Sequence, residues 1–138
     1  MVVVDASFLV AVFLEEAHTE FARGVLEEHS TATLGAPALV HWEIANVAWK
    51  KLRRGEITAG DLAAMAEFLD SLRLQHPPVP NAFETVELAM FAHQSGLSAY
   101  DASYLALAVQ QSAALATTDQ GLTRAALAAG LTVLSPFA

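Results

Sequence analysis

The chain opens with the stretch Val2-Val3-Val4-Asp5, in which three β-branched residues run directly into a carboxylate. An unbroken β-branched run of this kind is typical of a strand that is buried on both faces of a parallel sheet. A second short apolar run, Ala114 to Thr117, is again followed by an acid, Asp119. Ligands of open parallel sheets bind beyond the carboxyl ends of the strands. We therefore expect Asp5 and Asp119 at the edge of the sheet where a ligand would bind.

Helical patterns alternate with short strands along the rest of the chain. We expect strands at residues 2–4, 114–117 and 131–134, a weak edge strand or loop at 74–79, and helices at 6–14, 18–28, 38–54, 58–72, 81–93, 98–111 and 122–129. Thr58 and Asn81 each begin a capping sequence with an acid three residues later, whereas Gly35 and Pro37 indicate a turn. Strands that alternate with helices imply a parallel sheet covered by helices on both faces, so the predicted fold class is α/β.

The composition excludes several classes of protein. With 54% hydrophobic residues, the 138-residue chain is long enough to bury one core, and residues 1–138 are predicted to form a single domain. It has no cysteine, which excludes disulfides, thiol nucleophiles and zinc sites built from cysteine. An acid interrupts the N-terminal apolar run, and the longest uncharged stretch, Ala102 to Thr118, is too short and too polar to span a membrane. We therefore expect a cytoplasmic protein without a signal peptide or membrane span.

Two further acids lie in apolar surroundings. Glu43 sits among apolar neighbours in the predicted helix 38–54, where a carboxylate is costly to bury without a partner. Asp101 is the third residue of the capping sequence that begins at Ser98, a position that the helix dipole favours. Structural roles stay open for the strand-end acids too, because Asp5 is suited to cap a helix and Asp119 to form an Asx turn. Cap and ligand are compatible roles for one carboxylate.

Convergence of the four acids would have a definite chemical consequence. At about 4 Å and an effective dielectric constant of about 20, each pair of carboxylates repels by about 4 kcal/mol before screening. Such a cluster persists only where cations neutralise it, and oxygen ligands without His or Cys suit Mg²⁺ or Mn²⁺. The chemistry expected of that site is phosphodiester hydrolysis by a metal-bound water.

Other acid-centred or metal-centred sites fit less well. Phosphoaspartate hydrolases need a second aspartate two residues after the first, where this chain has Ser7. They also need a late lysine, and no lysine follows Lys51. The five histidines show no spacing typical of metal ligands and are expected at surface or loop positions.

Four short motifs contain the acids discussed above. They are Val-Val-Asp-Ala-Ser at 3–7, Glu-Ile-Ala-Asn at 43–46, Tyr-Asp-Ala-Ser-Tyr-Leu-Ala-Leu-Ala at 100–108 and Leu-Ala-Thr-Thr-Asp at 115–119. Together, and in this order, they resemble PIN-domain ribonucleases, and among these the VapC-type toxins of toxin–antitoxin pairs. The late segment Ala-Ala-Leu-Ala-Ala-Gly-Leu-Thr-Val at 125–133 fits the same pattern, so the resemblance covers the whole chain.

The resemblance implies a three-layer α/β/α sandwich with a central, mainly parallel sheet, and a Mg²⁺- or Mn²⁺-dependent endoribonuclease. Asp5, Glu43, Asp101 and Asp119 match the family's catalytic, metal-binding acidic quartet, and Ser7, Asn46 and Thr117 match polar positions that support it. Family members commonly form homodimers and are blocked by a small antitoxin whose C-terminal segment covers the acidic pocket. We expect that segment to be basic, because an arginine can pair with two carboxylates in fork geometry. The alternative is a non-catalytic PIN-like module whose acidic pocket docks a basic partner.

Basic residues gather in one place although the net charge is −8. Lys50, Lys51, Arg53 and Arg54 lie at the end of the predicted helix that carries Glu43. They are candidates for holding an RNA backbone, but a basic helix end that complements the helix dipole explains them equally well. On the same helix, Trp42 and Trp49 are seven residues apart on one stripe, and we interpret them as core or dimer packing rather than base stacking.

Overall fold

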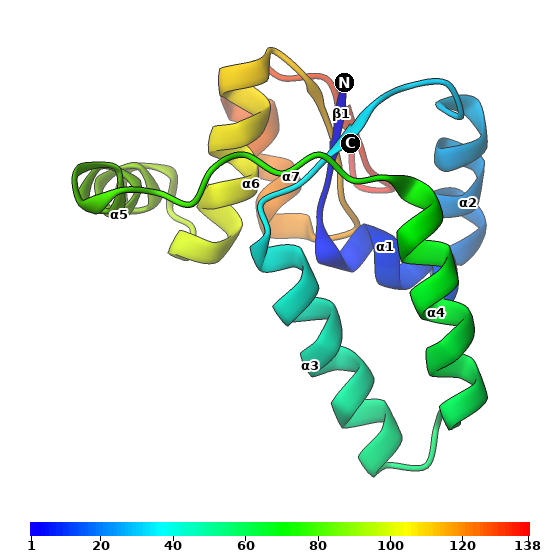
Figure 1. The fold of residues 1–138 in the computed structure, drawn as a ribbon. Helices are drawn as coiled ribbons and strands as arrows, with labels where there is room; N and C mark the ends of the chain where they lie inside the picture. Colours follow the sequence, from blue (N-terminus) through cyan, green and yellow to red (C-terminus); the bar gives the residue numbers. More distant parts are fainter.

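The computed structural model describes residues 1–138 and has a four-stranded parallel sheet at its centre, in the order β2-β1-β3-β4 (Figure 1). The strands are β1 (Val2–Val4), β2 (Leu34–Gly35), β3 (Ala114–Ala116) and β4 (Val133–Leu134). The helices are α1 (Ala6–Phe13), α2 (Thr19–Glu28), α3 (Leu39–Arg53), α4 (Ala59–Leu72), α5 (Ala82–Ser95), α6 (Ala99–Gln111) and α7 (Gln120–Ala128). Helices lie on both sides of the sheet, which confirms the predicted α/β/α architecture.

Strand β1 lies inside the sheet, between β2 and β3, and its three valines are buried, none of them exposing more than 5% of its surface. Val3 pairs with Gly35 of β2 on one side and with Leu115 of β3 on the other. Val4, the last residue of β1, lies opposite Ala116, the last residue of β3. The chain segments that follow these two strands therefore start side by side.

Strand β2 differs from the sequence-based expectation of a turn at Gly35. The sequence signal is weak because the strand has only two residues and one of them is glycine. A Cβ at this position would approach the Met1 sulfur to 2.9 Å, so a larger residue would require the flexible Met1 side chain to move. The predicted edge strand at 74–79 is reduced to a single parallel bridge between Gln75 and Gly35.

Three helices extend from the compact part of the molecule. Helices α3 and α4 form a pair that points away from the sheet, and α5 projects to another side (Figure 1). The predicted capping boxes at Thr58 and Asn81 are both present, and Gly96 ends α5 in a left-handed conformation. Helix α5 packs mainly on α6, and Ala92 is its only buried residue.

The core lies between the sheet and the helices α1, α6 and α7. Its largest fully buried hydrophobic side chains are Phe8, Leu9, Tyr104, Leu105, Leu115 and Leu122. Six of the eight residues of α1 are buried, and this helix carries no charged residue, in contrast to the amphipathic α2. Residues at the N-terminal end of α1 are thus held firmly against the sheet.

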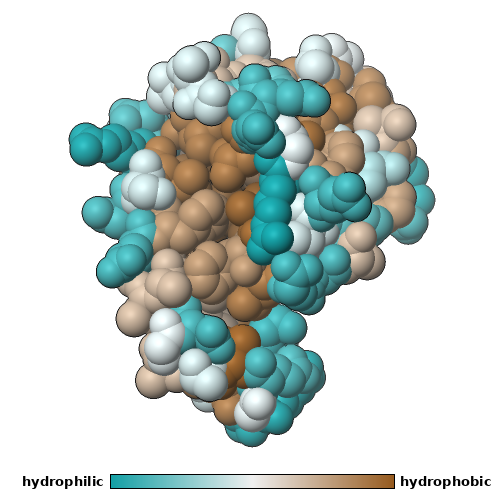
Figure 2. Space-filling model, turned by 90° about the vertical axis from the view of Figure 1, so that its right-hand side faces the viewer, coloured by the Kyte–Doolittle hydropathy of each residue, from teal (hydrophilic) through white to brown (hydrophobic).

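Apolar side chains also remain on the surface. Trp42 and Trp49 are 70% and 52% exposed, so the interpretation that they pack in the core of this chain is wrong. Figure 2 shows a broad hydrophobic area on the side of the molecule that carries α2 and α4. Between α1, α3 and α4 lies a small apolar gap of about 10 Å³, lined by Leu9, Val10, Phe13, Ile44, Met65, Phe68 and Leu69. No helix combines the length and the apolar character needed to cross a membrane.

Candidate active site

Asp5 lies where β1 passes into α1 and exposes only 4% of its surface. Its Oδ1 accepts hydrogen bonds from the Ser7 hydroxyl and the Phe8 N–H, both at 2.8 Å. Its Oδ2 accepts a hydrogen bond from the Thr117 hydroxyl at 2.6 Å. The bond from Phe8 is an N-cap interaction, whereas the bonds from Ser7 and Thr117 hold the carboxylate from α1 and from the end of β3.

Burial raises the pKa of Asp5 to about 6, although its three hydrogen bonds lower it, and the nearby charge of Asp101 adds to the increase. A shift of this size from 3.8 means that ionised Asp5 destabilises the fold at pH 7 by about 3 kcal/mol. The hydrogen bonds therefore do not compensate for the loss of water around the charge. A nearby cation would compensate for that loss by stabilising the ionised carboxylate.

The segment after β3 joins Asp119 to the same hydrogen-bond network. Thr117 is fully buried, and its hydroxyl accepts the Asp119 N–H at 3.0 Å while it donates to Asp5. Asp119 itself is exposed and caps α7, where its Oδ2 accepts the Leu122 N–H at 2.7 Å. One threonine side chain thus connects the residues that follow the two central strands.

Asp101 lies half-buried in the first turn of α6. Its N–H donates to the Ser98 hydroxyl at 3.1 Å, as the predicted cap requires. Unlike Asp61 and Glu84 in the two complete capping boxes, the Asp101 carboxylate does not return a bond to the N–H of its cap residue. Partial burial raises the pKa of Asp101, the charges of Asp119 and Glu43 add to this effect, and the Ser98 side chain opposes it. The cap accounts for the backbone of Asp101 but not for its carboxylate.

Glu43 is tied to α6 by Tyr104, a residue that the sequence motifs contain but did not single out. The buried Tyr104 hydroxyl donates a hydrogen bond of 2.5 Å to Glu43 Oε1, which joins α6 to α3. Burial, the bond to Glu43 and the charges of Glu43 and Asp5 raise the pKa of Tyr104, so that the hydroxyl remains a donor. Tyr104 lies three residues after Asp101, on the same face of α6, and this spacing is the signal that points to it.

The four acids share one electrostatic neighbourhood. Asp101 acts on the pKa of Asp5, while Asp119 and Glu43 act on the pKa of Asp101. As the side chains are placed, however, no group of three or more Asp, Glu or His residues is close enough together to hold a metal ion. The exposed Asn46 makes none of the hydrogen bonds to these acids, which come from side chains of Ser7, Thr117 and Tyr104 and from backbone N–H groups.

The basic residues Lys50, Lys51, Arg53 and Arg54 lie at the end of α3 that points away from the sheet (Figure 1). Lys51 forms an ion pair of 3.4 Å with Glu56, and Arg53 lies over the Trp49 ring at 4.7 Å from its centroid. Arg53 follows Glu43 by ten residues, which is about 15 Å along an α-helix. The basic cluster is separate from the acids but shares a helix with one of them.

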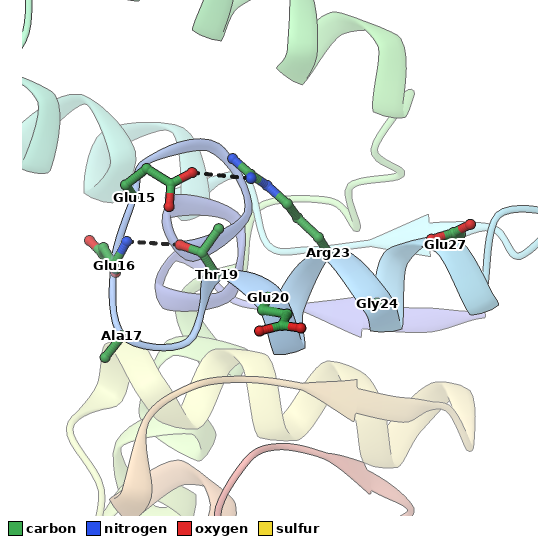
Figure 3. Close-up of a pocket in the computed structure, with 8 residues that line it drawn as sticks. All are labelled: Glu15, Glu16, Ala17, Thr19, Glu20, Arg23, Gly24 and Glu27. Atoms are coloured by element: carbon green, nitrogen blue, oxygen red, sulfur yellow. Dashed lines mark hydrogen bonds and ion pairs between the residues drawn. The ribbon is translucent and has the colours of Figure 1, made fainter.

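A surface hollow of about 560 Å³ lies at the opposite end of α1 from Asp5, where the chain turns into α2. It is surrounded by Glu15, Glu16, Glu20 and Glu27, and Arg23 is its one basic residue (Figure 3). Arg23 pairs with Glu15 at 3.1 Å. None of the four quartet acids lines this hollow, so it is not part of the site.

The side chains near the ends of β1 and β3 have the donor atoms that a hard divalent cation prefers. All the candidate ligands are carboxylate oxygens, which suit Mg²⁺ or Mn²⁺ rather than a metal that prefers nitrogen or sulfur. A carboxylate has about four acceptor positions, and three hydrogen bonds leave one of them free on Asp5 Oδ2. Glu43, Asp101 and Asp119 are partly or fully exposed, so their carboxylates are accessible to a cation from solvent. The residues therefore fit such a cation in chemistry and charge.

Comparison with known proteins identifies the family. The family model of the PIN domain matches residues 2–127. The chain belongs to the PIN-domain family. It is 33% identical over 125 residues to ribonuclease VapC3 of Pyrobaculum aerophilum, a match that covers 87% of this chain and 90% of that protein. It is also 33% identical over 123 residues to ribonuclease VapC9 of Mycobacterium tuberculosis, with 89% of each chain covered.

Solved structures share the fold of this PIN-domain protein. PAE2754 from Pyrobaculum aerophilum superposes with a TM-score of 0.72 at 24% identity, covering 96% of this chain and 83% of that one. FitAcB from Neisseria gonorrhoeae superposes with a TM-score of 0.60 at 20% identity, covering 96% of both chains. These superpositions establish the fold, whereas the two VapC ribonucleases confirm the VapC-type resemblance of the sequence motifs.

Proposed function

We propose that this PIN-domain protein is a divalent-metal-dependent endoribonuclease that hydrolyses RNA phosphodiester bonds, and that it is the toxin of a type II toxin–antitoxin pair. The environment of Asp5 carries the proposal. A carboxylate that is buried, oriented by three donors and further raised in pKa by the charge of Asp101 is better explained by a bound cation than by packing. The relatives named as VapC ribonucleases support RNA as the substrate.

The side chains divide into ligands and positioning groups. Asp5, Glu43, Asp101 and Asp119 are the proposed ligands of Mg²⁺ or Mn²⁺, which supplies a water of lowered pKa as the nucleophile when it is bound. Ser7 and Thr117 orient the Asp5 carboxylate by donating to its two oxygens. Tyr104 orients Glu43 in the same way from α6. Asn46, one turn after Glu43 on α3, is the remaining proposed supporting residue.

Cleavage of RNA by the purified protein tests the metal dependence. We expect cleavage with Mg²⁺ or Mn²⁺, no cleavage in EDTA, and recovery when the metal is restored in excess. Attack by a metal-bound water leaves 5′-phosphate and 3′-hydroxyl ends, which end-specific ligation detects. Full cleavage in EDTA, or products with 2′,3′-cyclic phosphates, would reject this mechanism. RNA binding without cleavage under every metal condition would favour the non-catalytic alternative.

We propose that the basic end of α3 holds the RNA backbone. The net charge of −8 repels RNA overall, so binding needs a local positive patch. Four of the seven Lys and Arg residues gather at this end, and the partners of Lys51 and Arg53, Glu56 and Trp49, are exposed at the surface. Because the patch shares a helix with Glu43, a strand bound there is directed along α3 toward the acids.

The proposed protein partner is a small antitoxin with a basic C-terminal segment. We call Asp5, Glu43, Asp101 and Asp119 together the acid cluster. An arginine that enters this cluster can pair with two carboxylates and so exclude both metal and RNA. Titration of the co-encoded small protein tests this route, because affinity should fall when Asp5→Asn and Asp101→Asn are combined. Equal affinity for the parent and the double variant would contradict it.

We propose that a second copy of the chain covers the outward face of α5. Phe83, Val86 and Met90 form a stripe on this face and are 81%, 70% and 57% exposed. Apolar stripes of this kind are uncommon on monomers, and the opposite face of α5 already packs on α6. A second copy of the chain offers an identical stripe, which an isologous contact would bury.

A further inference from the structure

Two histidines that are 35 residues apart in the sequence meet at the surface. His41 lies in the first turn of α3, and His76 lies in the segment between α4 and α5. Their Nε2 atoms are 3.0 Å apart, and the rings meet edge to face with a centroid distance of 4.9 Å. We propose that this pair is a binding site for Zn²⁺ or a similar transition metal, separate from the acid cluster and independent of the proposed function.

Backbone hydrogen bonds hold the segment of His76 in place. The Ala36 N–H donates to the Gln75 carbonyl at 3.0 Å, and the Gln75 N–H donates to the Leu34 carbonyl at 2.9 Å, which attaches this segment to β2. His76 Nδ1 lies 2.7 Å from the Ala36 carbonyl oxygen. A bond from the second ring nitrogen to a carbonyl is the usual arrangement in metal-ligating histidines, because it fixes the tautomer and aims the other nitrogen at the metal.

The hydrogen-bond pattern assigns the protons of the two rings. A carbonyl oxygen only accepts, so Nδ1 of neutral His76 carries the proton and its Nε2 presents a lone pair. His41 Nε2–H then donates to that lone pair. Metal binding would break this hydrogen bond, and the His41 proton would move to Nδ1. Both rings would then turn so that the two Nε2 lone pairs point to a metal beside the line that joins the nitrogens.

The spacing of the two nitrogens suits tetrahedral coordination. Two nitrogens that each lie about 2.05 Å from a tetrahedral zinc ion are about 3.3 Å apart. The two nitrogens therefore need to separate by only a few tenths of an ångström from their present 3.0 Å, while the exposed rings turn to aim both lone pairs at the metal. No third Asp, Glu or His is close enough to join the pair, so water or an outside ligand fills the other positions. Imidazole suits Zn²⁺, Ni²⁺ and Cu²⁺, whereas Mg²⁺ prefers oxygen, and this difference separates the pair from the acid cluster.

Calorimetric titration of the tag-free, full-length protein with Zn²⁺ tests the site, in excess Mg²⁺ so that the acid cluster does not take up the zinc. We expect the parent to bind Zn²⁺ at this pair. The affinity should fall about tenfold or more in His41→Gln and in His76→Gln, because loss of even an outer-shell partner costs about 10–100-fold. His93→Gln is the matched control, since it removes an exposed histidine from α5 and leaves the pair intact. Its affinity should equal that of the parent.

Cu²⁺ provides a second measurement that does not depend on affinity. The electron paramagnetic resonance spectrum of the parent with one equivalent of Cu²⁺ should show coupling to two imidazole nitrogens, and to fewer in either variant. Both histidines are exposed, so the variants should keep the circular dichroism spectrum of the parent. Equal Zn²⁺ affinity in the parent and both variants, an equal loss in His93→Gln, or a Cu²⁺ spectrum without nitrogen coupling would overturn the site. RNA cleavage enters none of these readouts.

Discussion

The acid cluster and helix α5 place their side chains in opposite ways. Around Asp5, polar groups point inward and find partners, and no buried side-chain nitrogen or oxygen in the molecule lacks a hydrogen bond. On α5, apolar side chains such as Phe83 and Met90 point outward and are largely exposed to solvent. The first arrangement destabilises the chain by burying a charge, and the second leaves apolar area in water. Each is explained by something that the chain itself does not supply, a cation for the cluster and a protein surface for the helix.

Replacing Asp5 by asparagine should have the largest effect on function. Cleavage should fall by at least about 100-fold, since changes to outer-shell partners of metal sites already cost about 10–100-fold. Asparagine keeps an oxygen to cap α1 and removes the buried charge. The metal-free variant should therefore be as stable as the parent at pH 7, or more stable by on the order of 1 kcal/mol. Cleavage assays with Mg²⁺ and denaturation in EDTA measure the two effects.

The pH dependence of stability in the same variant separates the effect of the Asp5 charge from its role as a helix cap. The pKa of Asp5 is raised from 3.8 to about 6, so the folded state of the parent binds more protons than the unfolded state in this range. The contribution of Asp5 to stability should therefore decrease as the pH rises from about 4 to about 6. The advantage of Asp5→Asn should grow over this interval and level off above it. A variant far less stable than the parent at pH 7 would show that Asp5 is mainly a structural cap.

Helix α5 is tested by placing a charge on its apolar stripe. Phe83→Glu should weaken dimerisation by about 30-fold, because a central apolar contact in an interface commonly contributes about 2 kcal/mol. Analytical ultracentrifugation over a range of concentrations measures this change. Ala89→Glu adds the same charge at an exposed α5 position outside the stripe and should leave the dimer intact. A parent that stays monomeric at high concentration would contradict the proposed interface.

The basic end of α3 should show a smaller effect, confined to RNA binding. Combining Arg53→Glu with Arg54→Glu should reduce RNA affinity by about tenfold and lower the slope of log affinity against log salt by about 1.4, at about 0.7 for each lost phosphate contact to a single strand. Stabilisation by Mg²⁺ should be unchanged. Arg73→Glu, at the end of α4, removes a positive charge outside the cluster and serves as the control. An unchanged salt slope would leave the cluster as a helix end that complements the dipole.

Tyr104→Phe should have the smallest effect on cleavage. It removes one donor from Glu43 and keeps the buried ring, so activity should fall by up to about tenfold and stability by about 1 kcal/mol. Tyr100→Phe is the matched control, because Tyr100 is exposed and its hydroxyl makes no hydrogen bond. Equal activity of the two variants would show that Tyr104 is a core residue without a positioning role.

The sequence predicts where Asp5 and Asp119 lie, because their positions depend only on the order and direction of the strands. Asp5 and Asp119 follow parallel strands, and parallel strands bring their carboxyl ends to one edge of a sheet. Other features required the structure. Asp101 is a cap in the sequence, and only the absence of a returned bond to Ser98 distinguishes it from Glu84 in α5. Strand β2 has too few residues for its pattern to be detected.

The sequence by itself determined what depends on near neighbours. The β-branched run predicts β1, and the capping sequences at Thr58 and Asn81 predict the starts of α4 and α5, because strand pattern and helix caps involve residues within about four positions. The tertiary structure alone decided the partners of distant side chains. Tyr104 reaches Glu43 across 61 residues, and His41 meets His76 across 35. Such meetings depend on where the packing of the core places each helix, and no local pattern encodes that placement.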